Sequence, residues 1–507
     1  MGHAVPGRLF GSPIGVGVPV RRPSQRLGAI LAVSLVMVVL PVPSSARTPL
    51  SAQMDVEAAY GAPNILLILT DDQRFDSLFA MPHVRQGLMA RGMTFTRATV
   101  SNAICCPSRA AILTGGYSHT SHVYTNVYTS WSPYGGWRAF HRAGDERATI
   151  AKALDAAGYR TALFGKYLND FPGNAAPPGW DRMAAFDHAH TGGAYYDYSL
   201  FVKDARGSRT KTYGSARDDY STTVLGRYAM SFLRGTRPGQ PFFMYLAPYA
   251  PHAAVVPAPR DVGSWSGYRQ NLRPNFNEGD LSDKPRYLRG RDRVGVVFTR
   301  HRFQVEYEGL QAVDRMVGRI IGYLRSSDRL HDTLIVFMSD NGIMFGEHRW
   351  PDKFPPYEES VRVPLVVRYD AVTGPRAGTR SSAIVSNVDL APTFAEAATV
   401  PFDGVGTVDG VSLMPLLRGE AHAVRRDLLL EHADYPAKYH VPSYCGLRTN
   451  GWVYVRYATG EQELYDLAKD PYELTNVAGR STEVRDRLRA RTRALCDPPP
   501  PGYTWGG

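Results

Sequence analysis

The 507-residue sequence has no internal repeats, no low-complexity tract and only four cysteines. The lack of repeats and of compositional bias excludes a solenoid, a fibre and a disordered chain. Hydrophobic residues make up 44 % of the sequence and charged residues 21 %, which is typical of a globular protein with a large core. Length alone would allow about two to four domains, although α/β enzymes often form longer single units.

The sequence also lacks the marks of a nucleic-acid-binding protein. It has no basic helix, no zinc-ligand spacing and no basic–aromatic RNA motif, so we expect no nucleic-acid partner. The formal net charge is nevertheless +11, and most of the positive charge is arginine. This excess has two interpretations, a solvated arginine-rich surface or a field that attracts a polyanionic substrate.

Only one apolar run resembles a targeting segment. Residues 27–40 are almost all apolar, arginines precede them, and the small residues 44–46 follow. A bilayer-spanning helix needs about 20 residues, so this shorter run predicts a cleaved signal peptide over residues 1–46 and no stable membrane anchor. The sequence thus predicts a secreted protein, in which Cys445 and Cys496 could form a disulfide.

Apolar strands alternate with helical patterns over residues 62–404, after a linker at 47–61. The strand candidates are continuous apolar runs at residues 65–69, 161–164, 241–246, 333–338 and 363–367. Helical patterns occupy residues 81–91, 107–113, 149–157 and 303–324. The alternation predicts an α/β fold with a large, mixed, mostly parallel sheet flanked by helices. Polar residues follow the strands directly, at the edge where open α/β sheets bind ligands.

The pattern changes beyond about residue 405. Residues 452–457 and 463–467 are typical of strands, and residues 482–495 of a helix. We expect residues 405–507 to form a smaller C-terminal antiparallel-sheet subdomain, beside the α/β domain at 62–404. The polar, arginine-rich residues 259–302 are expected to form a long surface loop beside the site, with Tyr287 at the rim as an aromatic face for a ligand.

The strongest motif is the run from Cys105 to Gly115, Cys-Cys-Pro-Ser-Arg-Ala-Ala-Ile-Leu-Thr-Gly. It resembles the signature C-x-P-S-R-A-x-x-L-T-G of the sulfatase family, whose first cysteine is oxidised to formylglycine by a maturation enzyme. A helix that starts near a proline and buries a cysteine would explain the local geometry, but not the whole run. The resemblance implies that Cys105 becomes the nucleophile, that Cys106 fills the variable position, and that the fold is alkaline-phosphatase-like.

Formylglycine suits sulfate-ester hydrolysis in an exported enzyme, where a free thiol would be oxidised. Its hydrated aldehyde carries two hydroxyl groups on one carbon. One hydroxyl attacks sulfur and expels the alcohol. Loss of a proton from the other re-forms the aldehyde and releases sulfate, so this is covalent catalysis with a built-in release step.

Two polar pairs follow buried strands, Asp71-Asp72 and Asp340-Asn341. Their oxygen ligands suit Ca²⁺ or Mg²⁺ rather than zinc. Each pair alone would be interpreted as a turn, but their order around the Cys105 motif resembles the metal site of the sulfatases. The resemblance implies a divalent cation held by these four residues and Cys105, which would neutralise the sulfate and help ionise the nucleophile.

Basic residues in this family bind the sulfate oxygens or protonate the leaving oxygen. The matching positions here are Lys166, His252 and Lys353. The resemblance adds Arg109, which should also hold the hydrated nucleophile. The alternative for an isolated lysine is a solvated surface residue.

One position departs from the usual pattern. Many arylsulfatases carry a second histidine that assists sulfate release, and this chain has Leu168 there. Either Asn169, another histidine such as His122, or water replaces it, or the release of sulfate is slower.

That departure, together with residues 71–73, 105–109, 165–169 and 409–413, resembles the N-acetylglucosamine-6-sulfatase branch. The resemblance implies removal of 6-O-sulfate from N-acetylglucosamine-type sulfated sugars or glycosaminoglycans. The alternatives are an arylsulfatase of broad specificity, and a phosphonate or phosphate monoester hydrolase on the same scaffold. An inactive binder of sulfated glycans is a further alternative, against which the intact set of acidic and basic residues argues.

Overall fold

The computed structural model describes residues 61–130, 132–187, 194–434 and 440–506. The expected signal peptide, and all but the last residue of the expected linker, lie outside the described residues. None of the described helices is both long and apolar enough to cross a membrane.

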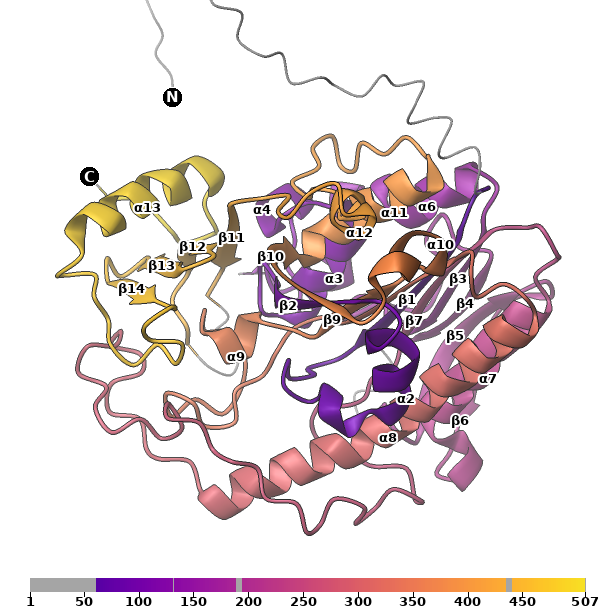
Figure 1. Cartoon of the computed structure of the whole chain (residues 1–507), viewed down its shortest axis with the longest axis horizontal. Coiled ribbons are helices and arrows are strands. Elements are labelled where there is room, and N and C mark those ends of the chain that lie inside the picture. The colour runs from indigo at the N-terminus through magenta and orange to yellow at the C-terminus, as the bar shows by residue number, and fades with distance from the viewer. Residues whose placement is uncertain (1–60, 131, 188–193, 435–439, 507) are drawn as a thin grey trace, which may run out of the picture. The chain divides into compact units, whose positions relative to one another are not determined.

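A ten-stranded sheet is the central element of the chain (Figure 1). Its strands, in spatial order, are β10 (Thr379–Ser386), β2 (Met93–Thr99), β9 (Leu365–Arg368), β8 (Thr333–Ser339), β1 (Asn64–Thr70), β7 (Phe242–Ala247), β3 (Arg160–Gly165), β4 (Arg182–Phe186), β5 (Tyr198–Asp204) and β6 (Gly207–Tyr213). The five central strands from β8 to β4 are mutually parallel. Because β9 and β5 run antiparallel to their neighbours, the sheet is mixed and mostly parallel, as the sequence predicts.

Strand β1 shows why the expected strands are continuous apolar runs. All of its residues are buried, and Ile65, Leu67 and Leu69 pack into one hydrophobic cluster. Leu66 and Ile68 pack into a second cluster. Since successive side chains point to opposite faces of a strand, a strand with cores on both faces needs apolar residues at every position.

Helices cover both faces of the sheet (Figure 1). One face packs against α3 (Cys105–Thr114), α6 (Ile150–Ala156) and α11 (Leu390–Ala398), and the other against α7 (Ser221–Arg234) and α8 (Val296–Ser326). The shorter helices are α2 (Pro82–Val84), α4 (Ser118–Ser121), α5 (Gly136–Ala143), α9 (Glu358–Val361), α10 (Asp370–Thr373) and α12 (Met414–Arg418). The helix expected at 303–324 is longer at its start, because α8 begins at Val296. The exposed Val297 and Phe298 break the amphipathic pattern in this first part of the helix.

The C-terminal part forms the antiparallel sheet that the sequence predicts. Its strands β11 (Asp427–His432), β12 (Tyr444–Thr449), β13 (Trp452–Tyr457) and β14 (Gln462–Asp466) lie side by side in chain order. Helix α13 (Thr482–Leu495) packs on this sheet through Leu488. The expected disulfide between Cys445 and Cys496 is confirmed.

The expectation for residues 259–302 was partly wrong. Residues 259–295 contain no helix or strand, but the remainder is the start of α8. Tyr287 was expected at the rim of the site, but its ring packs against the rings of Trp350 and Tyr457 and its hydroxyl lies 3.3 Å from that of Tyr457. The loop therefore contacts the C-terminal sheet through the rings of Tyr287 and Tyr457, a contact that the sequence does not predict.

Candidate active site and metal centre

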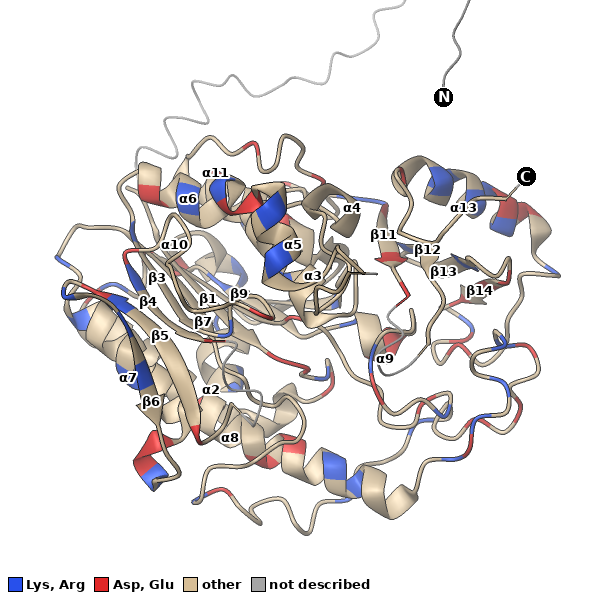
Figure 2. Cartoon of the chain, turned by 180° about the vertical axis from the view of Figure 1, so that it is seen from behind, with Lys and Arg blue, Asp and Glu red and all other residues tan. Residues whose placement is uncertain are grey.

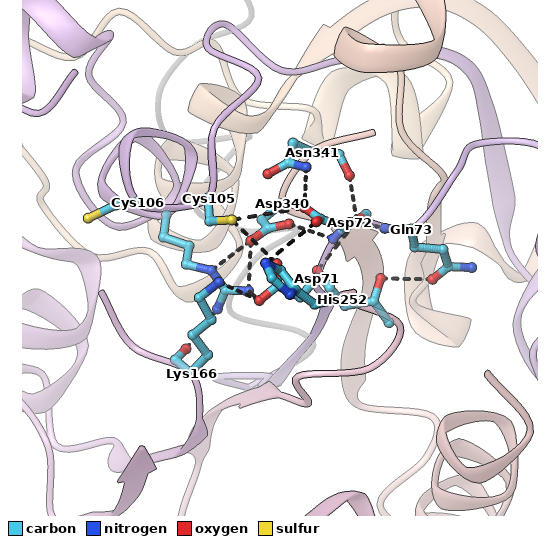
Figure 3. Close-up of polar contacts among 12 residues, drawn as sticks. Asp71, Asp72, Gln73, Cys105, Cys106, Lys166, His252, Asp340 and Asn341 are labelled. Atoms are coloured by element: carbon cyan, nitrogen blue, oxygen red, sulfur yellow. Dashed lines mark hydrogen bonds and ion pairs between the residues drawn. The ribbon is translucent and has the colours of Figure 1, made fainter. Parts of the chain in front are cut away.

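Polar side chains that follow neighbouring parallel strands meet at one edge of the large sheet (Figure 3). Asp71 and Asp72 come directly after β1, Asp340 and Asn341 after β8, and Lys166 after β3. Parallel strands bring their carboxyl ends to the same edge. The Nδ2 atom of Asn341 therefore donates to Asp72 Oδ1 at 2.6 Å, although the two residues are 269 positions apart.

Cys105 is the first residue of α3 and lies among these side chains. Its Sγ is 3.4 Å from Asp71 Oδ1 and 3.9 Å from Asp72 Oδ1. Cys106 is buried too, but its side chain points away into the hydrophobic core (Figure 3). The structure thus brings Cys105, rather than its neighbour, to the acidic residues, which is the register that the motif predicts.

Two lysines converge on the same point. Lys353 Nζ lies 2.8 Å from Cys105 Sγ and also donates to Asp72. Lys166 Nζ lies 2.5 Å from Asp71 Oδ2. Both lysines are buried, so neither is a solvated surface residue.

Arg109 projects from α3 into the site and is fully buried. Its Nε and Nη2 each lie 2.8 Å from Asp340 Oδ2, and its Nη1 donates to the backbone oxygen of Lys166 at 2.7 Å. Arg109 therefore fixes the carboxylate that follows β8 relative to the end of β3, in addition to any contact with a bound anion.

Burial and charge act in opposite directions on the acidic groups. Burial alone would raise the pKa of Asp71, but Lys166 and the other nearby cations bring it below its ordinary value. Burial would raise the pKa of Asp72 as well, but the charge of Lys353 and the other neighbouring cation lowers it below its ordinary value. The pKa of Asp340 is raised by burial and by the charge of Asp71.

The pKa of the Cys105 thiol is raised, whereas the pKa values of Asp71 and Asp72 are lowered. Burial and the charge of Asp71 raise its pKa to about 12, despite the two lysines. The protein groups around this thiol therefore hold it in the neutral form, which is a weak nucleophile.

The residues at this edge fit a divalent cation. Asp71, Asp72, Cys105 and His252 each offer a ligand atom, and these four atoms lie within 4.8 Å of one another. The Oδ1 atom of Asn341 is buried and has no hydrogen-bond partner. A buried carbonyl oxygen without a partner, beside carboxylates, matches the hard oxygen ligands that Ca²⁺ and Mg²⁺ prefer.

His252 forms the more open side of the site, with 25 % of its side chain exposed. Its Nε2 lies 3.6 Å from Asp72 Oδ2. The ring of Tyr249 lies 4.6 Å from that of His252, and the Tyr195 hydroxyl donates to the His252 carbonyl oxygen at 2.8 Å. Our sequence analysis missed both tyrosines. Tyr249 could have been found from its position three residues before His252, whereas nothing in the sequence connects Tyr195 to the site.

The structure also bears on the missing second histidine. Leu168 is buried in the hydrophobic core. His122 Nδ1 lies 3.7 Å from a carboxylate oxygen of Asp145, and its side chain is 63 % exposed. Asn169 has a buried Oδ1 without a hydrogen-bond partner. Of the two side chains that we considered as replacements, Asn169 has the free acceptor.

Comparison with known proteins identifies the family. The sulfatase family matches residues 63–400, and the C-terminal family of N-sulphoglucosamine sulphohydrolase matches residues 346–496. The chain therefore belongs to the sulfatase family. Its large mixed sheet, its flanking helices and its smaller antiparallel sheet are the fold that this membership implies.

Two relatives have names or titles that mention an amino sugar carrying sulfate. An N-acetylglucosamine-6-O-sulfatase of Bacteroides thetaiotaomicron is 29 % identical over 495 residues, which cover 83 % of each chain. A solved structure of a protein in complex with its substrate D-glucosamine-2-N,6-O-disulfate has a TM-score of 0.72 and 25 % identity, and the match covers 86 % of this chain and 98 % of that one.

Other relatives are much longer than this chain. An extracellular sulfatase SULF-1 homologue of Drosophila melanogaster is 33 % identical over 372 residues, which cover 72 % of this chain. The match covers 32 % of that relative, and 49 % of a similar one from Caenorhabditis elegans. The chain therefore spans half the length, or less, of these two relatives.

Proposed function

We propose that the protein hydrolyses sulfate esters, with formylglycine made from Cys105 as its nucleophile. The observation that carries this proposal is the position of Cys105 Sγ, 3.4 Å from Asp71 and 2.8 Å from Lys353, at the start of a helix. Oxidation by a maturation enzyme would replace a neutral thiol with a hydrated aldehyde at this position. The backbone N–H groups of the first turn of α3 favour an anion there.

The metal ligands in this proposal are Asp71, Asp72, Asp340, Asn341 and the modified Cys105. A bound Ca²⁺ or Mg²⁺ would supply the positive charge that neutralises the sulfate. The buried carboxylates of Asp71 and Asp72, whose pKa values are lowered, are ready to hold it in their ionised form.

The basic residues have different roles in this proposal. Lys353 and Lys166 lie close enough to Cys105 and Asp71 to orient sulfate oxygens. His252, on the open side, is placed to donate a proton to the leaving alcohol. Arg109 holds Asp340 and supports the hydrated nucleophile from α3.

For the substrate we propose a 6-O-sulfate on an N-acetylglucosamine-type sugar, free or in a glycosaminoglycan. The names of the Bacteroides relative and of the substrate bound in the solved structure support this choice. The similarity to extracellular sulfatases, together with the apolar run at 27–40, supports secretion through a signal peptide. The domain boundaries that we propose are 62–404 for the catalytic domain and 405–507 for the C-terminal subdomain.

The substrate is tested by the ratio of kcat/KM for N-acetylglucosamine-6-sulfate and for a simple aryl sulfate, with an aryl phosphate and an aryl phosphonate as further arms. We expect the sugar sulfate to be turned over at a higher kcat/KM than the phosphorus esters. A preference of several orders of magnitude for the aryl sulfate, with no turnover of the sugar, would refute the substrate. Higher activity on the phosphorus esters would refute sulfate-ester hydrolysis itself.

A further inference from the structure

Basic residues are spread over many elements of the chain, including α5, α7 and α13 (Figure 2). In one place several of them surround a hollow in the surface. It has a volume of about 540 Å³, within the usual range of small-molecule sites, about 300–1,000 Å³. The arginines at this hollow come from three segments: Arg315 and Arg319 from α8, Arg217 from the short 3₁₀ turn before α7, and Arg260 from the loop that follows His252.

The positive charge in this hollow is poorly compensated. Arg315 forms a bidentate ion pair with Asp261, at 2.7 and 2.6 Å. For Arg217, Arg260 and Arg319, no carboxylate in the described part of the chain lies within the 4.0 Å of an ion pair. Among the residues that line the hollow, Asp218 is the acidic one.

The arginines also repel one another. The pKa of Arg319, whose side chain is only partly covered by its neighbours, is lowered first by this partial burial and then by the charges of Arg315, Arg260 and Arg227. Holding guanidinium groups together in this way costs free energy, which a bound anion would offset. The planar donor fork of arginine matches the oxygens of sulfate and carboxylate groups.

We propose that this hollow is a second binding site, which holds the sulfate or carboxylate groups of a sulfated sugar chain while another part of the chain occupies the catalytic site. The class of ligand rests on the proposed function. A nucleic acid is the less suitable polyanion, because single strands bind by stacking bases on exposed aromatic rings. The phenol ring that lines this hollow, that of Tyr220, is buried, and its hydroxyl donates to the Val256 carbonyl oxygen. The exposed ring in the lining is the small imidazole of His83.

The hollow and the catalytic site share one fixed segment of chain. Arg260 lies eight residues after His252, and eight residues span at most about 28 Å. The Tyr195 hydroxyl fixes the start of this segment at His252, and the Tyr220 hydroxyl fixes its middle at Val256. A sugar chain of several units is therefore long enough to reach from one site to the other.

The test compares two charge-matched double variants of the full chain. Arg260→Glu/Arg319→Glu reverses two exposed arginines at the hollow, and Arg487→Glu/Arg493→Glu reverses two exposed arginines on α13. The probe is a heparin octasaccharide, whose equilibrium binding is measured at low and at physiological salt. We expect the hollow variant to bind about tenfold or more weakly than the unmodified protein, and the α13 variant to bind within about twofold of it.

Three outcomes would overturn the proposal. The first is an equal loss of octasaccharide affinity in both double variants, and the second is no loss in either variant. The third is that the hollow variant loses as much affinity for a DNA oligonucleotide of matched charge as for the octasaccharide. The kcat/KM for N-acetylglucosamine-6-sulfate, a single sugar that binds at the catalytic site, should be unchanged in both variants. Loss of octasaccharide binding at the hollow, in a protein that turns over no 6-sulfated amino sugar, would leave the second site standing and refute the proposed substrate instead.

Discussion

The ammonium nitrogen of Lys353 lies 2.8 Å from the sulfur of Cys105, although 248 positions separate the two residues. Lys353 follows β8 by way of a loop, and Cys105 opens α3, so the contact exists only because the sheet brings β8 close to the start of that helix. If Cys105 becomes the attacking group, Lys353 is the nearest cation to the charge that develops on the transferred sulfate.

Lys353→Ala should therefore lower kcat by about a hundredfold or more, because it removes a buried charge aimed at the reacting atoms. Lys469→Ala is the matched control, since that side chain is 85 % exposed and far along the chain in the C-terminal part. Steady-state kinetics on a sulfate ester, with circular dichroism to check folding, measure both. Equal activities of the two variants would show that Lys353 has no catalytic part.

The acidic residues predict a metal requirement. Treatment with a chelator should abolish turnover, and Ca²⁺ or Mg²⁺ should restore it. Saturating metal should also raise the free energy of unfolding, by about 2.7 kcal/mol at a hundredfold excess over Kd. Asp71→Ala and Asp340→Ala should remain folded and lose both effects.

A second group of buried residues provides the control for the metal experiment. His348, Glu359 and Glu473 also offer ligand atoms within 4.8 Å of one another. Glu473→Gln should leave the metal-dependent activity intact. Full activity of a metal-free protein would refute the metal site at Asp71 and Asp340, and stabilisation that survives Asp71→Ala but not Glu473→Gln would move the metal to the second group.

Glu306 predicts a pH dependence of stability. Burial raises the pKa of its carboxyl to about 8, although Arg74 opposes the shift. Between the ordinary pKa and this raised value, the folded state keeps a proton that the unfolded state has lost. The free energy of unfolding should therefore fall as the pH rises from about 4.5 to 8, by up to about 1.4 kcal/mol per pH unit from this group.

The variant Glu306→Gln, which is neutral at every pH, should weaken that slope. The exposed Glu483→Gln on α13 is the control and should leave it unchanged. Urea unfolding at several pH values measures all three proteins. Parallel curves for Glu306→Gln and the unmodified protein would contradict the raised pKa.

The disulfide between Cys445 and Cys496 closes a loop of 51 residues. On the chain-entropy account its removal by Cys445→Ser/Cys496→Ser should lower the free energy of unfolding of the C-terminal part by about 4 kcal/mol. Denaturant unfolding followed by the fluorescence of Trp452 and Trp505, both in this part of the chain, would show the change. Two free thiols in protein purified from an oxidising compartment would contradict the bond itself.

Much of the site could be predicted from the sequence, because its residues follow strands that contain continuous apolar runs. Asp71, Lys166 and Asp340 are of this kind, and the motif at Cys105 fixes the register of α3. Strand β6 was missed for the opposite reason. β6 is exposed at six of its seven positions, so its polar residues carry no pattern that separates a strand from a loop.

Contacts made only by the folded chain could not be predicted. Tyr195 reaches the His252 carbonyl oxygen, and Tyr287 packs between Trp350 and Tyr457, through pairings of residues that are distant in sequence. The hollow formed by Arg217, Arg260 and Arg319 is of the same kind. The net charge of +11 indicates an excess of arginine, but not where arginines gather without acidic partners.

The central claim is that Cys105 is oxidised and that the product is the nucleophile. Trypsin should release residues 98–109, which contain both Cys105 and Cys106, and fragmentation of this peptide by mass spectrometry assigns any change to one of them. In active protein we predict a loss of about 18 Da at Cys105, the mass change from a thiol to an aldehyde, with Cys106 unmodified. Cys105→Ala should lower turnover by about a thousandfold or more, while Cys106→Ala keeps a substantial part of it. An active protein with an intact thiol at Cys105, or with the modification at Cys106, would contradict the account.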